Sequence, residues 1–188
     1  MEQIIESIKK EMKISNETIA LLRESLTPLQ VSKKTLLIDP FVKDGNLYIV
    51  EKGIARAFTV IDGKEITSWF SQEGDLLYST NSFHGKTEGY EEEMVQVLED
   101  SLLYYMPLSR LEKLCFSNIE IANWIRIIHQ KAFLNMERRL IYRFNYSAEE
   151  RYKDFMKHHS VLFHRVNLGY IASYLGMSHV TLCALRKS

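Results

Sequence analysis

The sequence predicts a mixed α+β protein in three parts: an N-terminal antiparallel β-barrel or jelly-roll domain, a long connecting helix, and a C-terminal pair of short helices. Three observations support this prediction. Short β-branched and aromatic stretches separated by Gly, Asp and Asn fill residues 29–106. Apolar residues recur at steps of three and four over residues 118–145. Residues 167–188 hold two apolar-periodic segments around a Gly-Met-Ser turn, a pattern typical of a helix-turn-helix.

Composition limits the class of protein. The 188 residues contain 24 Lys and Arg against 24 Asp and Glu. No apolar run has membrane-spanning length and the N-terminus is charged, so we expect a cytoplasmic protein without a membrane partner. Cys115 and Cys183 lie far apart, which supports neither a disulfide framework nor a cysteine cluster.

Residues 2–26 predict one or two helices. Ser15 or Asn16 is expected to cap the second helix, and Pro28 closes the segment. The apolar residues at helical spacing are Ile4, Ile5, Ile8, Met12, Ile19, Leu22 and Leu26.

The β segment divides into six expected strands. Asp62-Gly63 stands between two of them and indicates a hairpin. No βαβ alternation and no GxGxxG motif is present, which argues against a Rossmann fold. The expected strands are 35–38, 46–51, 54–60, 65–70, 94–99 and 102–106.

Helix returns after Pro107. A short element is expected over 108–114, and Asn118 is expected to cap a helix to residue 145, about 42 Å long. This helix is apolar on two faces, which favours a partner helix from a second subunit; intramolecular packing alone is the alternative. The expected dimer face is Ile121, Trp124, Ile125, Ile128, Ala132 and Met136, and the other face is Ile127, Phe133, Leu134, Leu140, Ile141 and Phe144.

The C-terminal segment is helical and basic. Ser147 and Glu150 form a capping-box sequence that opens a helix to about His158, followed by a loop through His164. Asn167 is expected to cap the next helix. Residues 138–188 carry nine Lys and Arg against three Asp and Glu, a formal charge of +6, whereas the preceding residues carry −6. A basic segment on an acidic body suits a polyanionic partner, although ordinary fluctuation also produces such a window.

This order of parts resembles the cyclic-AMP receptor/fumarate-nitrate regulator (Crp/Fnr) superfamily of bacterial transcription factors. The most specific segments are Ser147–Tyr152 (SAEERY), Val166–Ser178 (VNLGYIASYLGMS) and Val97–Asp100 (VLED). The resemblance implies a homodimer, a cyclic-nucleotide-binding-like jelly-roll domain over 1–117, a dimerisation helix over 118–145 and a helix-turn-helix domain over 146–188. It implies that a recognition helix at 178–187 enters the major groove of double-stranded operator DNA, that the β domain holds a small-molecule effector, and that RNA polymerase is a candidate partner.

The chain departs from the nucleotide-binding members of that family. Tyr78-Ser79 stands where they have the ribose-binding Gly-Glu pair, and Glu91-Glu92 stands where they have the phosphate-binding Arg-Ser pair. Carboxylates repel a phosphodiester, whereas a guanidinium forks onto its oxygens. We therefore expect no cyclic-AMP binding. Two isolated cysteines also cannot hold the iron–sulfur cluster of the oxygen-sensing branch, and no cofactor is expected.

The recognition helix departs as well. His179, Val180 and Ala184 occupy positions where the family commonly has Arg, Glu and Arg, which suit base edges. Sequence specificity is therefore weak, comes from DNA shape, or is directed to a different operator. The expected DNA contacts are Ser178, His179, Val180, Thr181, Arg186 and Lys187.

Two other functions share the predicted scaffold. A metal enzyme on a jelly-roll scaffold needs converging histidines, and the β segment has only His84, so an enzyme is not expected. A sensor or interaction protein of the same fold that has lost specific DNA binding is the main alternative. The candidate effector-pocket residues, which equally suit barrel core, are Trp69, Phe70, Tyr78, Ser79 and Phe83.

Overall fold

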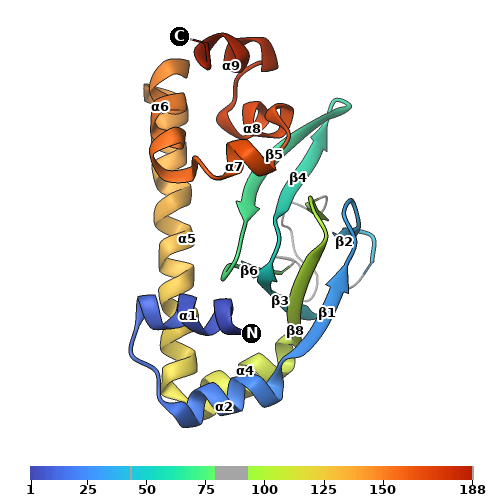
Figure 1. Cartoon of the computed structure of the whole chain (residues 1–188), viewed down its shortest axis with the longest axis vertical. Coiled ribbons are helices and arrows are strands. Elements are labelled where there is room, and N and C mark those ends of the chain that lie inside the picture. Colours follow the sequence, from blue (N-terminus) through green and yellow to red (C-terminus); the bar gives the residue numbers. More distant parts are fainter. Residues whose placement is uncertain (43, 79–92, 188) are drawn as a thin grey trace.

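Two four-stranded antiparallel sheets form the centre of the chain (Figure 1). The computed structural model describes residues 1–42, 44–78 and 93–187. The first sheet has the order β1 (Thr27–Val31), β8 (Ser101–Pro107), β3 (Asn46–Lys52) and β6 (Leu76–Leu77). The second has the order β2 (Leu36–Ile38), β7 (Met94–Val97), β4 (Ala55–Ile61) and β5 (Lys64–Ser71). Buried side chains of both sheets, among them Val50, Ala57, Val95 and Leu103, form a shared core.

The predicted hairpin is confirmed. Asp62 and Gly63 both have positive φ, 51° and 73°, and join β4 to β5, with Ile61 opposite Lys64. The six expected strands all form, with ends within a few residues of the prediction. β1 and β6 were not predicted. Pro28 lies inside β1, where its missing N–H is tolerated because β1 is an edge strand that pairs only with β8.

Helices cover the outer face of the first sheet. They are α1 (Glu2–Glu11), α2 (Asn16–Ser25), α4 (Leu108–Ser117) and the beginning of α5 (Ile119–Asn145). The Ser15 hydroxyl accepts the Thr18 N–H at 3.2 Å, and the Asn118 side chain accepts two N–H groups of α5 at 3.0 Å, so both predicted caps form. Ile4, Leu22 and Trp124 belong to one core with Leu47 of β3, which fixes the base of α5 to the sheet.

The remaining helices form a unit that we call the head, beside the far half of α5 (Figure 1). They are α6 (Ala148–His159), α7 (Leu162–Arg165), α8 (Leu168–Leu175) and α9 (His179–Leu185). The capping box of Ser147 and Glu150 is present. The loop expected through His164 instead contains α7, one turn of helix whose Leu162 is buried in the head. We call the two sheets with α1, α2 and α4 the body.

No single helix in the described parts of the chain is long and apolar enough to cross a membrane.

Candidate nucleic-acid interface

The two C-terminal helices meet at a tightly capped turn. The Asn167 side chain accepts the Gly169 N–H at 2.7 Å at the start of α8, and Gly176 ends that helix in the left-handed conformation, φ 65° and ψ 41°. The Ser178 hydroxyl accepts the Thr181 N–H at 3.0 Å at the start of α9. These bonds satisfy groups that helix ends otherwise leave unpaired. The turn bends the chain by 98° between the two helices.

The second helix, α9, buries Leu182 and leaves His179, Val180 and Ala184 exposed. Leu182 is fully buried in the core of the head, whereas the Val180 side chain is 77% exposed. Thr181 is half-buried, and its hydroxyl bonds to that of Ser178 at 2.8 Å, so both oxygens serve the helix cap. The exposed residues of the region are Ser178, His179, Val180, Ala184, Arg186 and Lys187.

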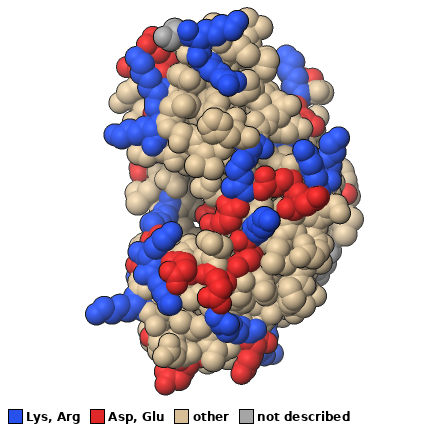
Figure 2. Space-filling model, viewed as in Figure 1, with Lys and Arg blue, Asp and Glu red and all other residues tan. Residues whose placement is uncertain are grey.

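Lys and Arg side chains border the end of the molecule that carries α9, whereas most Asp and Glu side chains on this face lie lower, over the body (Figure 2). Several cations of residues 138–188 have partners within the chain. Arg138 pairs with Asp154, and Arg151 donates to the Leu175 carbonyl at 3.0 Å. The +6 charge of the segment is therefore only partly directed outward. Among the described residues, no acidic side chain bonds to Arg186 or Lys187.

Arg165 contributes to the +6 charge of residues 138–188, but it faces the body. Its guanidinium binds both oxygens of Glu73, at 2.7 and 3.0 Å, and also bonds to Glu99. This bidentate contact lowers the pKa of Glu73 to about 2, with the N–H of Gly53 also favouring the carboxylate, and it raises the pKa of Arg165. Arg165 thus joins the head to the body.

A second arginine was missed by sequence reasoning. Arg56 of β4 is 1% exposed, and its guanidinium carbon lies 4.1 Å from the ring centroid of Phe58 and 3.4 Å from that of Tyr170 in α8. It pairs with Glu65 and donates to Gln96 at 3.2 Å. A buried charge needs such partners. The sequence did contain a feature that indicates a buried arginine: Arg56 is the single charged residue in the apolar stretch from Ile54 to Phe58.

The structure describes three of the five expected effector-pocket residues, Trp69, Phe70 and Tyr78. Trp69 packs against the core between the sheets, while its neighbour Phe70 points to the opposite face of β5 and meets Tyr174 of the head at 5.4 Å between ring centroids. Phe70 is therefore part of the head contact and does not share a pocket with Trp69. Ser79 and Phe83 lie outside the described residues.

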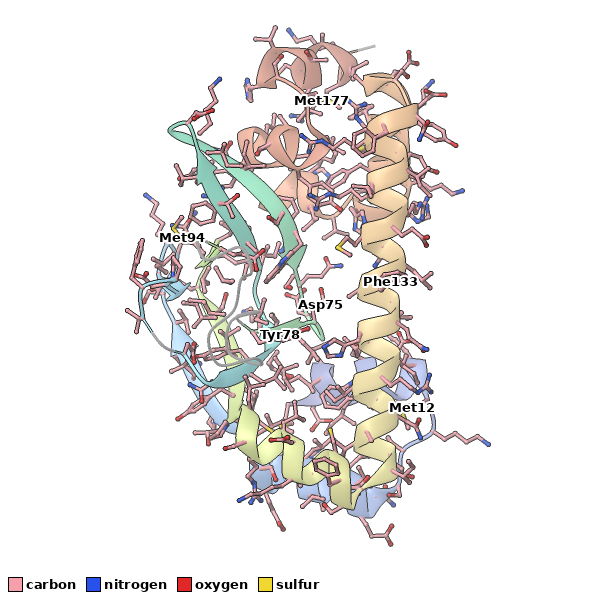
Figure 3. All side chains as sticks on the ribbon, turned by 180° about the vertical axis from the view of Figure 1, so that it is seen from behind. Met12, Asp75, Tyr78, Met94, Phe133 and Met177 are labelled. Carbon is pink, nitrogen blue, oxygen red and sulfur yellow. The ribbon has the colours of Figure 1, made fainter. Side chains whose placement is uncertain are left out.

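Tyr78, the remaining member, faces the long helix. Its hydroxyl bonds to Nε2 of His129 in α5 at 2.7 Å, and Nδ1 of that histidine bonds to the Ile125 carbonyl at 2.8 Å. Figure 3 shows Tyr78 and Asp75 on the side of the sheets that faces α5. Burial raises the pKa of Tyr78. An open groove of about 700 Å³ beside this contact is lined by Arg126, His129, Gln130, Phe133 and Leu134.

The expected dimer face of α5 is partly wrong. Ile121 and Trp124 are 0% and 1% exposed because α1 and α4 of the same chain cover them, and Ile125 and Ile128 pack against the same core. Ala132 and Met136, farther along, are exposed. The apolar residues that α5 leaves open belong mainly to the second face: Phe133, Leu134, Met136, Leu140, Ile141 and Phe144, between 49% and 77% exposed.

The described residues contain no group of three or more His, Cys, Asp or Glu arranged to hold a metal ion.

No protein-family model matches the chain, and a comparison with curated proteins also gives no match. Solved structures do resemble it. FixK2 from Bradyrhizobium japonicum is 17% identical, with 86% of this chain and 83% of that chain aligned at a TM-score of 0.71. A Crp/Fnr-family transcriptional regulator from Eubacterium rectale is 15% identical over 93% and 82%, at 0.68. The c-di-GMP-responsive global regulator CLP from Xanthomonas campestris is 17% identical over 92% and 90%, at 0.69. The structures that this chain resembles over most of its length are thus Crp/Fnr regulators, and the chain has their fold.

Proposed function

We propose that this protein is a homodimeric DNA-binding transcription regulator whose α9 enters the major groove of double-stranded operator DNA. The three parts then serve as an effector-type domain (1–117), a dimerisation helix (118–145) and a helix-turn-helix domain (146–188). RNA polymerase is a further candidate partner. The protein acts in the cytoplasm and is not an enzyme.

The observation that carries the proposal is the geometry of α8 and α9. Their 98° bend at a Gly-containing turn falls within the range of helix-turn-helix pairs. Leu182 anchors α9 in the head, while His179, Val180 and Lys187 remain accessible to a partner. The likeness in fold to solved transcription regulators supports the same function.

The test is DNA affinity for the protein's own upstream region over a salt series. The logarithm of the binding constant falls with the logarithm of the salt concentration, and each phosphate contact adds about 0.9 to the steepness of that fall. A dimer carries two copies of Lys187, so Lys187→Ala is expected to make the slope shallower by about 2. Lys153→Ala is the matched control, because Lys153 is an exposed cation of the head that pairs with Glu149. Wild-type protein without affinity at low salt, or with a slope near zero, would refute DNA binding.

The dimer is proposed to form along the open apolar face of α5. Ile127, Leu134 and Ile141 recur every seven residues, as do Phe133 and Leu140, so each set lies along one side of the helix. Six large apolar side chains in this part of α5 are at least 49% exposed, more than a solvated helix ordinarily presents.

We propose that the protein binds an effector other than cyclic AMP, or none. Glu91 and Glu92, which motivate this, lie outside the described residues, but the adjacent Glu93 is described. Burial raises its pKa, opposed by a hydrogen bond from Trp69. A half-buried carboxyl there carries no positive charge to pair with a phosphodiester, unlike an arginine. Calorimetry is expected to show no cyclic-AMP binding at micromolar concentrations, and a measured affinity in that range would contradict the proposal.

The second candidate is a sensor or interaction protein of this fold without specific DNA binding. It is favoured by Val180 and Ala184, because the most accessible face of α9 presents two side chains that cannot hydrogen-bond to a base edge. Equal affinity for the upstream region and for shuffled DNA, at every salt concentration, would favour it.

A further inference from the structure

The head covers the open edge of β5. This strand is the last in its sheet and pairs only with β4. Ser173 of α8 lies against its other side, where the Ser173 hydroxyl accepts the Thr67 N–H and donates to the Glu65 carbonyl, both at 2.9 Å. One side chain thus satisfies two backbone groups that a neighbouring strand would otherwise pair.

Charged contacts flank this point on both sides. The guanidinium of Arg165 in α7 is held by two body carboxylates, Glu73 and Glu99. The Tyr170 ring of α8 lies against the guanidinium of Arg56, which also contacts the Phe58 ring. Arg side chains held in this bidentate or stacked way have a defined geometry, unlike a solvated lysine.

The contact is also apolar. Three body side chains, Ile54, Phe70 and Leu98, belong to the same core as the buried residues of the head. Ile54 is 1% exposed, and the Leu98 N–H donates to the Ile54 carbonyl at 2.7 Å. Head and body therefore share one hydrophobic cluster, which a flexible linker between them would not produce.

The DNA-reading helix takes no part in these contacts. Arg165 belongs to α7, and Tyr170 and Ser173 belong to α8. In Figure 1, α7 and α8 lie against β4 and β5, while α9 lies at the end of the molecule. The docked head therefore leaves the outer surface of α9 accessible, including Val180 at 77% exposure.

We propose that the body sets the orientation in which α9 meets DNA, through a contact that we call the brace: Arg165 with Glu73 and Glu99, Ser173 with the β5 backbone, and Tyr170 over Arg56. Arg165 and Ser173 are then positioning residues for DNA binding, although neither contacts DNA. The proposal rests on the proposed DNA-binding function. Its physical basis is that a head free to sample many orientations binds more weakly, in proportion to the fraction that is competent.

The test is the double variant Glu73→Gln/Glu99→Gln. It weakens the hold on Arg165 but keeps an amide oxygen for the Gly53 N–H, which Glu73 accepts at 3.0 Å. It also removes two negative charges, so simple electrostatics predicts tighter DNA binding, whereas the brace predicts weaker binding. If undocking leaves about a tenth of the heads in the competent orientation, apparent affinity falls about ten-fold.

Hydrogen exchange of the Thr67 amide reports docking directly, because Thr67 is fully buried and its N–H bonds to the head. The double variant is expected to exchange this amide faster and to bind DNA more weakly. Ser173→Ala is expected to act in the same direction. Glu24→Gln/Glu112→Gln, at two exposed body carboxylates, changes the charge equally and is expected to leave Thr67 exchange unchanged and not to weaken DNA binding.

The outcomes separate the two proposals. Unchanged Thr67 exchange in both brace variants, or faster exchange with undiminished DNA affinity, would overturn the brace while leaving DNA binding intact. Wild-type protein with a protected Thr67 amide but no DNA affinity would refute the proposed function, and with it the claim that this docked orientation is competent.

Discussion

Replacing Leu134 and Ile141 by glutamate is expected to split the dimer into monomers that stay folded. Both side chains lie on the open face of α5, seven residues apart, and are 59% and 49% exposed in the single chain. Glutamate is a good helix former, so α5 itself is expected to persist. The substitution therefore acts on association and leaves the chain's own core intact.

The size of the effect follows from these exposed fractions. Full burial of a Leu or Ile side chain stabilises by about 2 kcal/mol, so covering the exposed half of each is worth about 1 kcal/mol. Four such side chains in a dimer contribute about 4 kcal/mol, which corresponds to a roughly thousand-fold increase in the dimer Kd. Repulsion among the introduced carboxylates adds to this.

Sedimentation velocity over a concentration series measures the Kd directly. The expected result is a dimer at micromolar wild-type concentration and a monomer for the double variant at the same concentration, with unchanged helical circular dichroism. Phe116→Glu is the control, because Phe116 is 86% exposed but lies on α4. Wild-type monomer at micromolar concentration, or an undiminished dimer in the double variant, would refute the assignment of this face.

Three further predictions concern the single chain. Trp124→Ala, at a side chain 1% exposed, is expected to lower the free energy of unfolding by about 3–5 kcal/mol in urea titrations; a loss below about 1 kcal/mol would contradict its place in the core. Gly176→Ala is expected to cost about 1–2 kcal/mol because of the positive φ, and the Arg143 guanidinium, 3.2 Å from the added Cβ, has to move. Because the pKa of Glu73 is lowered to about 2, its bond to Arg165 stabilises the fold fully above pH 4.5 and is lost as the pH falls toward 2. Wild type is therefore expected to lose more stability between pH 5 and pH 3 than Glu73→Gln, by up to roughly 2 kcal/mol, and equal losses would contradict the contact.

Local signals in the sequence were sufficient for most elements. The Asp62-Gly63 hairpin and the Ser147 capping box depend on backbone conformation and on neighbours within three residues, and both form as predicted. β1 was missed because Pro28 is a strand breaker everywhere except at an edge, and edges are set by tertiary structure. β6 has only two residues, too short to show alternation.

The candidate site was less predictable because it depends on which partner a side chain meets. A helix that is apolar on two faces does not reveal which one its own chain covers, so Ile121 and Trp124 were assigned to the wrong interface. Trp69 and Phe70 are adjacent in the sequence and were assigned to one pocket. Successive side chains of a β-strand point to opposite faces, so the two rings belong to different hydrophobic clusters. Arg165 was counted in the basic segment 138–188, although its carboxylate partners are 66 and 92 residues away in the chain.

The position of Ser173 on β5 has a consequence for the isolated N-terminal part. A chain truncated before the head would expose the Thr67 N–H and the Glu65 carbonyl on an unprotected strand edge, next to the uncovered side chains of Ile54 and Phe70. Such edges recruit strands from other molecules. The head therefore also shields the body from self-association, and the truncated body is expected to form sheet-mediated oligomers that the full chain avoids.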